Sequence, residues 1–351
     1  MAYRIGAIVP RSASVILWHD SYYTFTYAHG LPRSLGPRAA TLWRLIMGPI
    51  LLGRFAAVSR GFLYLGQQGY LESYADHRSG EFAFLRDRGV RIVCYFVGGD
   101  IRSPLLLREL ADRTGQLNLG TQLVLADPAY GTAEHEEQKR AIAAVADEYA
   151  DLIFSASTDQ LSYLTRPTLP ITYFYPDDNF APANDKFDRI DVPVLVHAPT
   201  NLVIKGTALV RDAVERLRVE GYVFEYVELV GASNDTVLRE LRRAHIVLNQ
   251  FYAFIPGVFG IEGLAARCAV LMSADETIEP DLPAGSNRAW YVTRYDQVYD
   301  HLKDLLDHPE KIEPLADAGQ AWARENVSFS QAGPRLRHEL QALTAGPPTA
   351  H

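Results

Sequence analysis

The amino-acid sequence predicts an α/β protein with two doubly wound, Rossmann-like domains that face a cleft. Its length of 351 residues suits two domains better than one. Short apolar runs alternate with helical patterns in both halves, which is typical of parallel sheets covered by helices. A polar, turn-rich stretch at 176–185 separates the halves. We therefore expect domains at 1–180 and 191–330, followed by a partly frayed C-terminal tail at 331–351.

Composition and charge argue against several classes of function. The net charge is −8 and no lysine- or arginine-rich run occurs, which argues against a nucleic-acid partner. The two cysteines, Cys94 and Cys268, lie inside apolar patterns, so we expect buried free thiols and a cytoplasmic location. The histidines and cysteines form no metal-binding motif, and we expect no metal.

The predicted elements of the first half alternate along the chain. Continuous apolar runs predict strands at 5–9, 62–65, 91–97, 122–126 and 152–154. Helical spacing predicts helices at 81–88, 105–113 and 134–149.

The most apolar stretch of the first half is 39–58. Arg44 and Arg54 interrupt it and Gly48-Pro49 breaks it, so it does not resemble a membrane span. We interpret it as a buried pair of helices. The alternative is peripheral docking at the inner membrane face, with the arginines meeting anionic lipid.

The second half repeats the alternation. Strands are predicted at 194–198, 222–230, 246–248 and 269–272. Helices are predicted at 206–219, 236–244, 260–267, 295–306 and 314–326.

Two helix starts in the second half carry residues suited to a nucleotide sugar. Lys205 precedes Gly206 at a helix start, where free amides and the dipole favour an anion such as a diphosphate. A solvated lysine is the alternative. Glu262 follows the glycine-punctuated segment 257–260 and suits vicinal hydroxyls. A capping glutamate is the alternative there.

Two loops of the first half are candidates for acceptor binding. Gly99, Asp100 and Arg102 follow a predicted strand, at the edge where ligands bind in open α/β sheets. The segment 18–30 is rich in tyrosine and includes His19 and Asp20. His19 has a pKa suited to a general base. The alternative for this segment is a loop packed over the core by its tyrosines.

These segments resemble a known family. Residues 194–201 with 205–207 resemble the start of the C-terminal domain in GT-B glycosyltransferases of the family 1/family 4 group. Residues 259–266 resemble the donor-site helix of that group, and 96–102 are similar to a turn in its first domain.

The resemblance implies a metal-independent transfer of a hexose or deoxyhexose from a UDP- or GDP-sugar, without a cofactor. The acceptor would be a glycan, a lipid-linked molecule or a small molecule. Lys205 would bind the donor phosphates and Glu262 the ribose hydroxyls. The expected donor-site residues are Lys205, Gly206, Thr200, Asn201, His197, Glu262, Gly260, Ile261 and Tyr252. The expected acceptor-side residues are Arg102, Asp20 and Gly99, with Asp100 and His19 as catalytic candidates.

The sequence departs from the family pattern on the sugar side. The first glutamate of the family's Glu-x7-Glu motif corresponds to Phe254, and 250–261 contains no carboxylate. Phe254 and Ile255 favour a more apolar pocket, as for a deoxy sugar. Two alternatives remain beside an active transferase: a degenerate GT-B protein that binds a nucleotide sugar or a partner without turnover, and a nucleotide-sugar epimerase.

Overall fold

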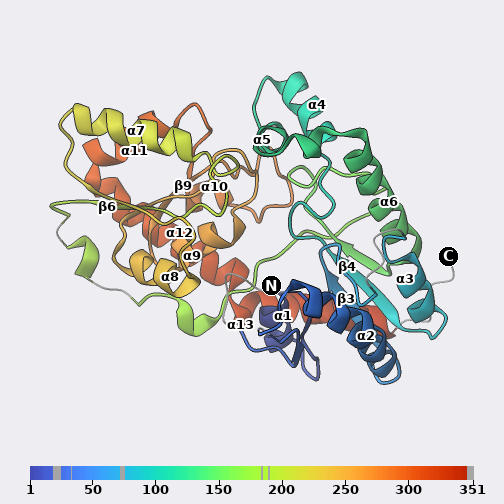
Figure 1. Ribbon diagram of the computed structural model, residues 1–351. Coiled ribbons are helices and arrows are strands. Elements are labelled where there is room, and N and C mark those ends of the chain that lie inside the picture. The colour runs from blue at the N-terminus through green and yellow to red at the C-terminus, as the bar shows by residue number, and fades with distance from the viewer. Residues whose placement is uncertain (19–24, 33, 72–75, 183–184, 189, 346–351) are drawn as a thin grey trace. The chain divides into compact units, whose positions relative to one another are not determined.

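The computed structural model describes residues 1–18, 25–32, 34–71, 76–182, 185–188 and 190–345 (Figure 1). The chain forms two compact units, and each is assembled from separate segments. Unit 1 comprises Met1–Ser103, Ala133–Ile171 and Gly333–His351, and unit 2 comprises Pro104–Thr132 and Thr172–Ala332. The expected domains at 1–180 and 191–330 are continuous segments, whereas in the structure the chain enters each unit more than once.

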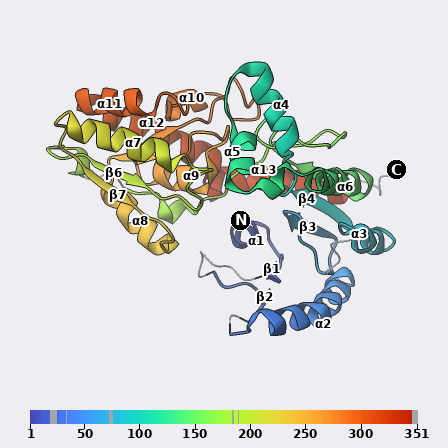
Figure 2. The same cartoon turned by 45° about the horizontal axis from the view of Figure 1, so that its top comes forward.

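Unit 1 is built on a three-stranded parallel sheet in the order β3-β4-β5, formed by Gly61–Leu65, Arg91–Tyr95 and Leu152–Phe154. Its main helices are α2 (Pro37–Ala56), α3 (Ser79–Arg86), α6 (Ala133–Tyr149) and α13 (Phe329–Ala345). Two short strands, β1 (Val15–Ile16) and β2 (His29–Gly30), pair with each other apart from this sheet (Figure 2). The apolar core lies between the sheet and helices α2, α3 and α6.

Unit 2 holds a five-stranded parallel sheet in the order β10-β9-β8-β6-β7. Its strands are β6 (Val194–His197), β7 (Glu225–Glu228), β8 (Ile246–Leu248), β9 (Ala269–Met272) and β10 (Tyr291–Val292). Its helices are α4 (Pro104–Thr114), α5 (Leu119–Ala126), α7 (Thr207–Val219), α8 (Asn234–Arg243), α9 (Gly257–Ala265), α10 (Ser286–Ala289), α11 (Val298–Asp307) and α12 (Ile312–Val327). The predicted α/β class with two parallel-sheet units is therefore confirmed.

Two predicted strands are wrong. Residues 5–9 fall largely in helix α1 (Ala2–Ile8), whose buried Ile5 and Ile8 are one helical turn apart. Residues 122–126 form the end of α5, where Asn118 caps the helix by accepting from Gly120 N. Short apolar runs fit a strand or a buried helix equally well, and in both places a helical spacing of inward residues decided the outcome.

The predicted buried helix pair at 39–58 is also wrong. The segment is the single helix α2, which continues through Pro49. One side of α2 carries the buried residues Ala40, Gly48, Leu51, Leu52 and Ala56. Gly48 is required there because a Cβ would lie 2.0 Å from the Tyr70 carbonyl oxygen. The opposite side is exposed and apolar, so only half of the helix meets the expectation of burial.

The expected C-terminal tail is helical over most of its length. Helix α13 continues to Ala345 and includes Pro334. Arg337 donates a hydrogen bond of 2.9 Å from Nη1 to the carbonyl of Ile8. The C-terminal helix thus returns to the N-terminal helix of unit 1, and residues 346–351 lie outside the described part. No helix among the described residues has the length and apolar character to cross a membrane.

Candidate functional site

The strand order of unit 2 defines one place where a ligand would bind. Strand β6 has β7 on one side and β8 on the other. The chain adds β7 at one side of β6 and then crosses over to add β8 at the other side, so the strand order reverses at β6. In open parallel sheets the crevice at such a reversal, outside the carboxyl ends of the strands, is the usual ligand site. The loops 198–206 and 249–256 follow β6 and β8, and they flank this position.

His197 is the last residue of β6, and its side chain joins the end of β8 to the start of α7. Its Nδ1 lies 2.7 Å from the Leu248 carbonyl and its Nε2 lies 2.9 Å from Thr207 Oγ1. Because a carbonyl only accepts, Nδ1 carries the proton and Nε2 accepts from the threonine hydroxyl. Burial lowers the pKa of His197 to about 4, so the ring is neutral. Both ring nitrogens thus form hydrogen bonds within the protein. We interpret His197 as a buried residue that holds the predicted donor site in shape.

Lys205 is the cation of this site. Its ammonium donates to Gln250 Oε1, which joins the loop after β6 to the loop after β8. Gln250 is buried and donates in turn from Nε2 to the Ile255 carbonyl at 2.6 Å. An amide partner orients the ammonium but leaves its charge in place, in contrast to a carboxylate partner. The half-buried Lys205 thus lies beside the reversal point of the sheet and joins the two loops that flank it.

The turn before α7 places Gly206 at the helix start. Asn201 Oδ1 accepts from Val203 N and Ile204 N, both at 3.0 Å, while Thr200 is exposed beside it. Gly206 adopts a left-handed φ of 71°, which other residues rarely tolerate. A Cβ at Gly206 would also approach Tyr252 Cε2 to 3.3 Å. Gly206 and Tyr252, both expected at the donor site, are thus brought together.

The start of α9 forms the other wall. The helix begins at Gly257, whose amide donates to the Tyr173 hydroxyl at 3.0 Å. Gly260 packs against the Asn249 amide, where a Cβ would lie 2.5 Å from Nδ2. Ile261 lies in the apolar core, so it supports the helix from within and does not line a surface.

Glu262 lies further into α9 than the sequence indicated. It is the sixth residue of the helix, beyond the first turn where the dipole favours a carboxylate. Its buried side chain reaches the start of α8, where Asn234 Nδ2 donates to Oε1 at 2.9 Å. The structure thus places Glu262 against α8, while Lys205 contacts the loop after β8.

The loop after β4 in unit 1 holds Gly99 and Asp100. The Asp100 carboxylate accepts from Val97 N at 2.9 Å and lies against Gly66, where a Cβ would approach Asp100 Cγ to 3.1 Å. Lys139 donates to the carbonyl oxygens of Gly99 at 2.5 Å and of Asp100 at 3.1 Å. Burial lowers the pKa of Lys139. These contacts fix the backbone of the loop and leave Asp100 only partly buried.

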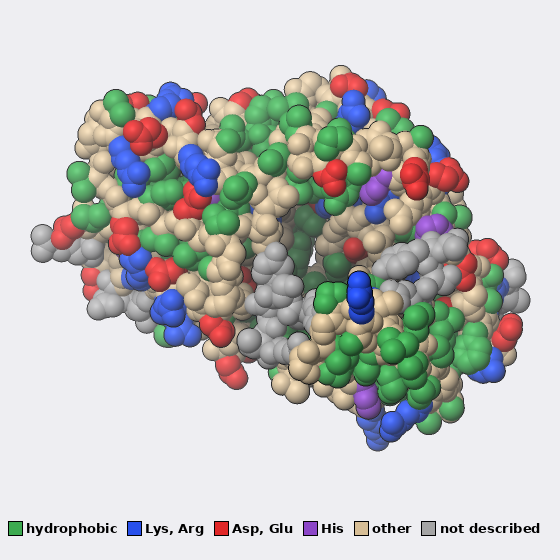
Figure 3. All heavy atoms as spheres, in the orientation of Figure 1, with side chains coloured by type: hydrophobic (Ala, Val, Ile, Leu, Met, Phe, Trp, Pro, Cys, Tyr) green, Lys and Arg blue, Asp and Glu red, His purple; other side chains and the backbone are tan. Residues whose placement is uncertain are grey.

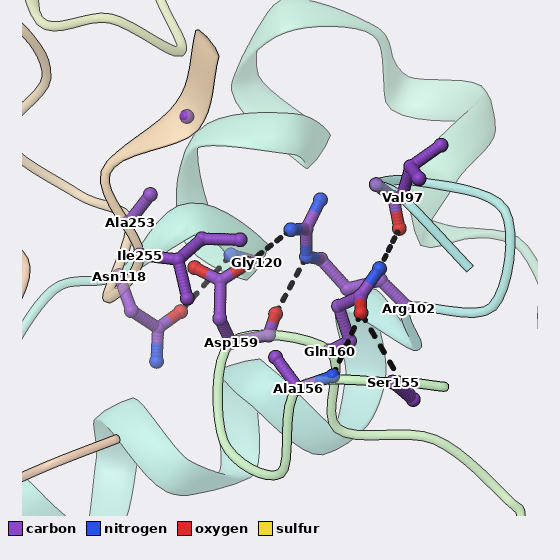
Figure 4. A network of polar contacts seen from close by, with 12 residues as sticks. Val97, Arg102, Asn118, Gly120, Ser155, Ala156, Asp159, Gln160, Ala253 and Ile255 are labelled. Atoms are coloured by element: carbon purple, nitrogen blue, oxygen red, sulfur yellow. Dashed lines mark hydrogen bonds and ion pairs between the residues drawn. The ribbon is translucent and has the colours of Figure 1, made fainter. Parts of the chain in front are cut away.

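Arg102 is committed to a buried ion pair. Its guanidinium points at Asp159, as Figure 4 shows, with Nε donating to the Asp159 carbonyl at 2.6 Å and Nη2 to the carboxylate. Gln160 braces the neighbouring turn by accepting from Ala156 N at 2.9 Å. Arg102 therefore holds the strand-end loop to the turn after β5, and its charge is balanced internally.

The remaining candidates lie elsewhere or outside the described part. His19 and Asp20 belong to 19–24, which the structure does not describe. Across the described residues, no cluster of histidine, cysteine and carboxylate side chains could hold a metal ion.

Sequence reasoning did not assign Gln250 as the partner of Lys205, nor Asn234 as the partner of Glu262. Both partners carry weak signals. Gln250 is the second residue after the buried strand β8, and Asn234 follows Ser233, whose side chain caps α8. Ser273, which follows β9, was also missed; its Oγ donates to the Ala253 carbonyl at 2.7 Å and secures the loop after β8.

Comparison with known proteins identifies the fold. No protein-family model matches the chain, and no curated protein matches its sequence. Among solved structures, sucrose-phosphate synthase from Thermosynechococcus elongatus is similar with a TM-score of 0.56 and 12% identity, over 93% of this chain and 86% of that one.

Two further solved structures are similar over 86% of this chain and 84% of theirs. The Anabaena protein HepE, in complex with UDP-glucose, has a TM-score of 0.52 and 10% identity. An α-glucosyltransferase in complex with UDP-glucose and DNA containing an abasic site has a TM-score of 0.53 and 11% identity. The two parallel-sheet units and these similarities lead to one conclusion: the chain has the fold of the GT-B glycosyltransferases.

Proposed function

We propose that this protein is a metal-independent glycosyltransferase that uses a nucleotide-sugar donor. The observation that carries the proposal is Lys205, a cation held by the neutral amide of Gln250 where the sheet of unit 2 reverses direction. Together with the start of α7, this cation would neutralise a diphosphate leaving group without a metal. Glu262 would accept the ribose hydroxyls after exchanging its contact with Asn234.

A UDP-hexose is the donor that the similar structures favour, with a GDP-sugar next. HepE and the α-glucosyltransferase were solved with UDP-glucose. We propose a hexose or a deoxyhexose as the transferred group, because Phe254 and Ile255 are buried and apolar where a sugar-binding glutamate was expected. An apolar wall suits a deoxy position of the sugar, because no hydroxyl has to be bound there. A sugar hydroxyl against the same wall would lose its hydrogen bonds to water without gaining a partner.

We place the acceptor on unit 1. Asp100, at the end of β4, is the first candidate for the group that orients or deprotonates an acceptor hydroxyl, and His19 is the second. Gly99 allows close approach beside Asp100, whereas Arg102 positions the loop through Asp159. The acceptor would be a glycan, a lipid-linked molecule or a small molecule, met in the cytoplasm or at the inner membrane face.

A second candidate is a degenerate protein that binds a nucleotide sugar without turnover. The observation behind it is the absence of a carboxylate from 250–261. The transferase is favoured because Lys205 and Glu262, the residues proposed for the phosphates and the ribose, are both present.

Nucleotide release from a panel of UDP-, GDP- and TDP-sugars tests the proposal. We expect one donor to release its nucleotide when an acceptor extract is added. Lys205→Met should weaken binding of the nucleoside diphosphate by roughly ten- to a hundredfold, since hydrogen bonds to charged groups contribute about 1.5–3 kcal/mol. Glu262→Ala should weaken it too, while Arg218→Met, at the far end of α7, serves as the control.

The outcomes separate the candidates. Binding without release for every donor would favour the degenerate protein. Undiminished UDP and GDP binding by both Lys205→Met and Glu262→Ala would show that the site is misplaced.

A further inference from the structure

Helix α2 is apolar on both sides, although only one side is buried. Its inner side packs on unit 1 through Leu51, Leu52 and Ala56. Its outer side carries a row of exposed apolar side chains at helical spacing: Leu42 at 59%, Leu45 at 53%, Ile46 at 53% and Ile50 at 54% exposure. A helix that is apolar all round is ordinarily buried on all sides, so the outer row of α2 is unpartnered apolar surface that needs an occupant.

Exposed arginines stand before and after the outer row on α2. Arg38 and Arg54 are exposed on α2, before and after the four apolar side chains. Figure 3 shows apolar side chains gathered over α2 with cationic ones at the margin. The sequence from Ser21 to Leu71 contains no aspartate or glutamate, yet it contains Arg33, Arg38, Arg44, Arg54 and Arg60. This local excess of positive charge stands in a chain whose net charge is −8.

The exposed row is continuous along the middle of α2. From Leu42 to Ile50 it spans about 12 Å, at the 1.5 Å rise per residue of an α-helix. Arg44, in the middle of the helix, bends back so that its guanidinium lies 4.1 Å from the Trp18 ring centroid. The Arg44 guanidinium therefore lies against Trp18 and not among the exposed apolar side chains, so the row is not interrupted by a charge.

We propose that α2 docks unit 1 on an anionic lipid surface, with Leu42, Leu45, Ile46 and Ile50 entering the headgroup–acyl boundary. Arg38 and Arg54 then meet the lipid phosphates at the two ends of the row. The charge of the segment selects this occupant, because the rest of the chain is acidic and a second copy would bring the same arginines against themselves. The contact leaves α2 in place, since its inner side remains packed on the core.

The docking surface gives the proposed transferase a route to its acceptor. It rests on that function only for the choice of acceptor, which would be lipid-linked and supplied at the membrane surface. The surface itself depends on unit 1 alone. If the Lys205 site binds no nucleotide, the proposed transferase is overturned and the docking surface stands. If the protein binds no vesicles, the docking surface is overturned and the proposed transferase stands.

Sedimentation of the full-length protein with lipid vesicles tests the proposal. The probes are vesicles of phosphatidylcholine alone and of equal parts phosphatidylcholine and phosphatidylglycerol. We expect binding to the mixed vesicles that weakens with added salt. Leu45→Gln and Ile46→Gln should each weaken it by at least about tenfold, because each removes a buried apolar side chain from the lipid. Arg38→Gln and Arg54→Gln should each weaken it by about fivefold.

Matched controls lie on unit 2. Leu125 is 71% exposed on α5, and Leu125→Gln should bind vesicles like wild type. Arg108 is exposed on α4, and Arg108→Gln controls for loss of one charge. All of these variants replace exposed side chains, so thermal unfolding should be unchanged, which shows that each variant is folded.

Three outcomes would overturn the proposal. One is no sedimentation with either vesicle. Another is equal binding to both vesicles, which would remove the role of the arginines. The third is a wild-type dimer in gel filtration that Leu45→Gln converts to a monomer, which would show that a second copy covers the row.

Discussion

Lys205 and Arg102 are two cations at strand ends that the fold treats in opposite ways. Arg102 follows β4 and is buried against the carboxylate of Asp159. Lys205 follows β6, is half-buried and meets the neutral amide of Gln250. A carboxylate partner balances the charge of a cation and makes it part of the scaffold, whereas an amide partner orients a cation without cancelling its charge. Partner chemistry therefore separates the two cations by role, although the sequence presents both as a basic residue after a strand.

The largest expected difference between the two cations is in stability. Arg102→Met should cost about 3–5 kcal/mol, because the buried carboxylate of Asp159 loses the guanidinium that pairs with it. Lys205→Met should cost less than about 1 kcal/mol, since Gln250 remains neutral when its partner is lost. Urea unfolding of the two variants beside wild type measures both values.

A paired replacement sharpens this test. Arg102→Met combined with Asp159→Leu removes both charges together and should recover part of the loss, since partners in one ion pair are not additive. An equal loss of stability for Lys205→Met and Arg102→Met would mean that Lys205 is scaffold too.

The next largest effect is the pH dependence of stability that comes from His197. This neutral side chain hydrogen-bonds Thr207, which lies two residues after Lys205. Its pKa falls from 6.5 to about 4 on burial, so between these values the unfolded chain binds a proton that the native protein does not. The stabilisation is therefore complete above pH 6.5 and is lost as the pH falls toward 4. At about 1.4 kcal/mol per pKa unit, it amounts to roughly 3 kcal/mol.

Comparison of wild type with His197→Gln isolates this contribution. A glutamine side chain can donate to the Leu248 carbonyl and accept from Thr207, but it does not titrate. Unfolding free energies measured from pH 7 to pH 4 should therefore fall more steeply for wild type than for the variant. Parallel curves would mean that folding does not lower the pKa of His197.

The sequence was most informative where one pattern allowed one structure. The helix at 134–149 has a helical spacing of apolar residues that is too long for a strand, and it forms close to its predicted bounds. The runs at 5–9 and 122–126 were ambiguous because a short apolar run fits a strand or a buried helix. At the site, residue types and loops were predictable, but partners were not. Nothing near Arg102 in sequence indicates Asp159, which is 57 positions away.

The smallest effect tests the comparison directly, by giving Lys205 the kind of partner that Arg102 has. Gln250→Glu keeps the size of the side chain and replaces the neutral amide with a carboxylate. At neutral pH the new carboxylate should neutralise Lys205 and repel the ligand phosphates, weakening UDP binding by about tenfold, or 1.4 kcal/mol. Isothermal titration calorimetry measures the affinity.

The pH dependence of the same variant separates charge from shape. Affinity of Gln250→Glu should recover toward wild type as the pH falls and the new carboxyl group is protonated, because its neutral form resembles the amide. Gln331→Glu adds the same charge to an exposed position of unit 2 and should bind UDP like wild type at every pH. If Gln250→Glu bound UDP as tightly as wild type at neutral pH, the charge of Lys205 would not act on the ligand. The contrast between Lys205 and Arg102 would then be one of burial alone.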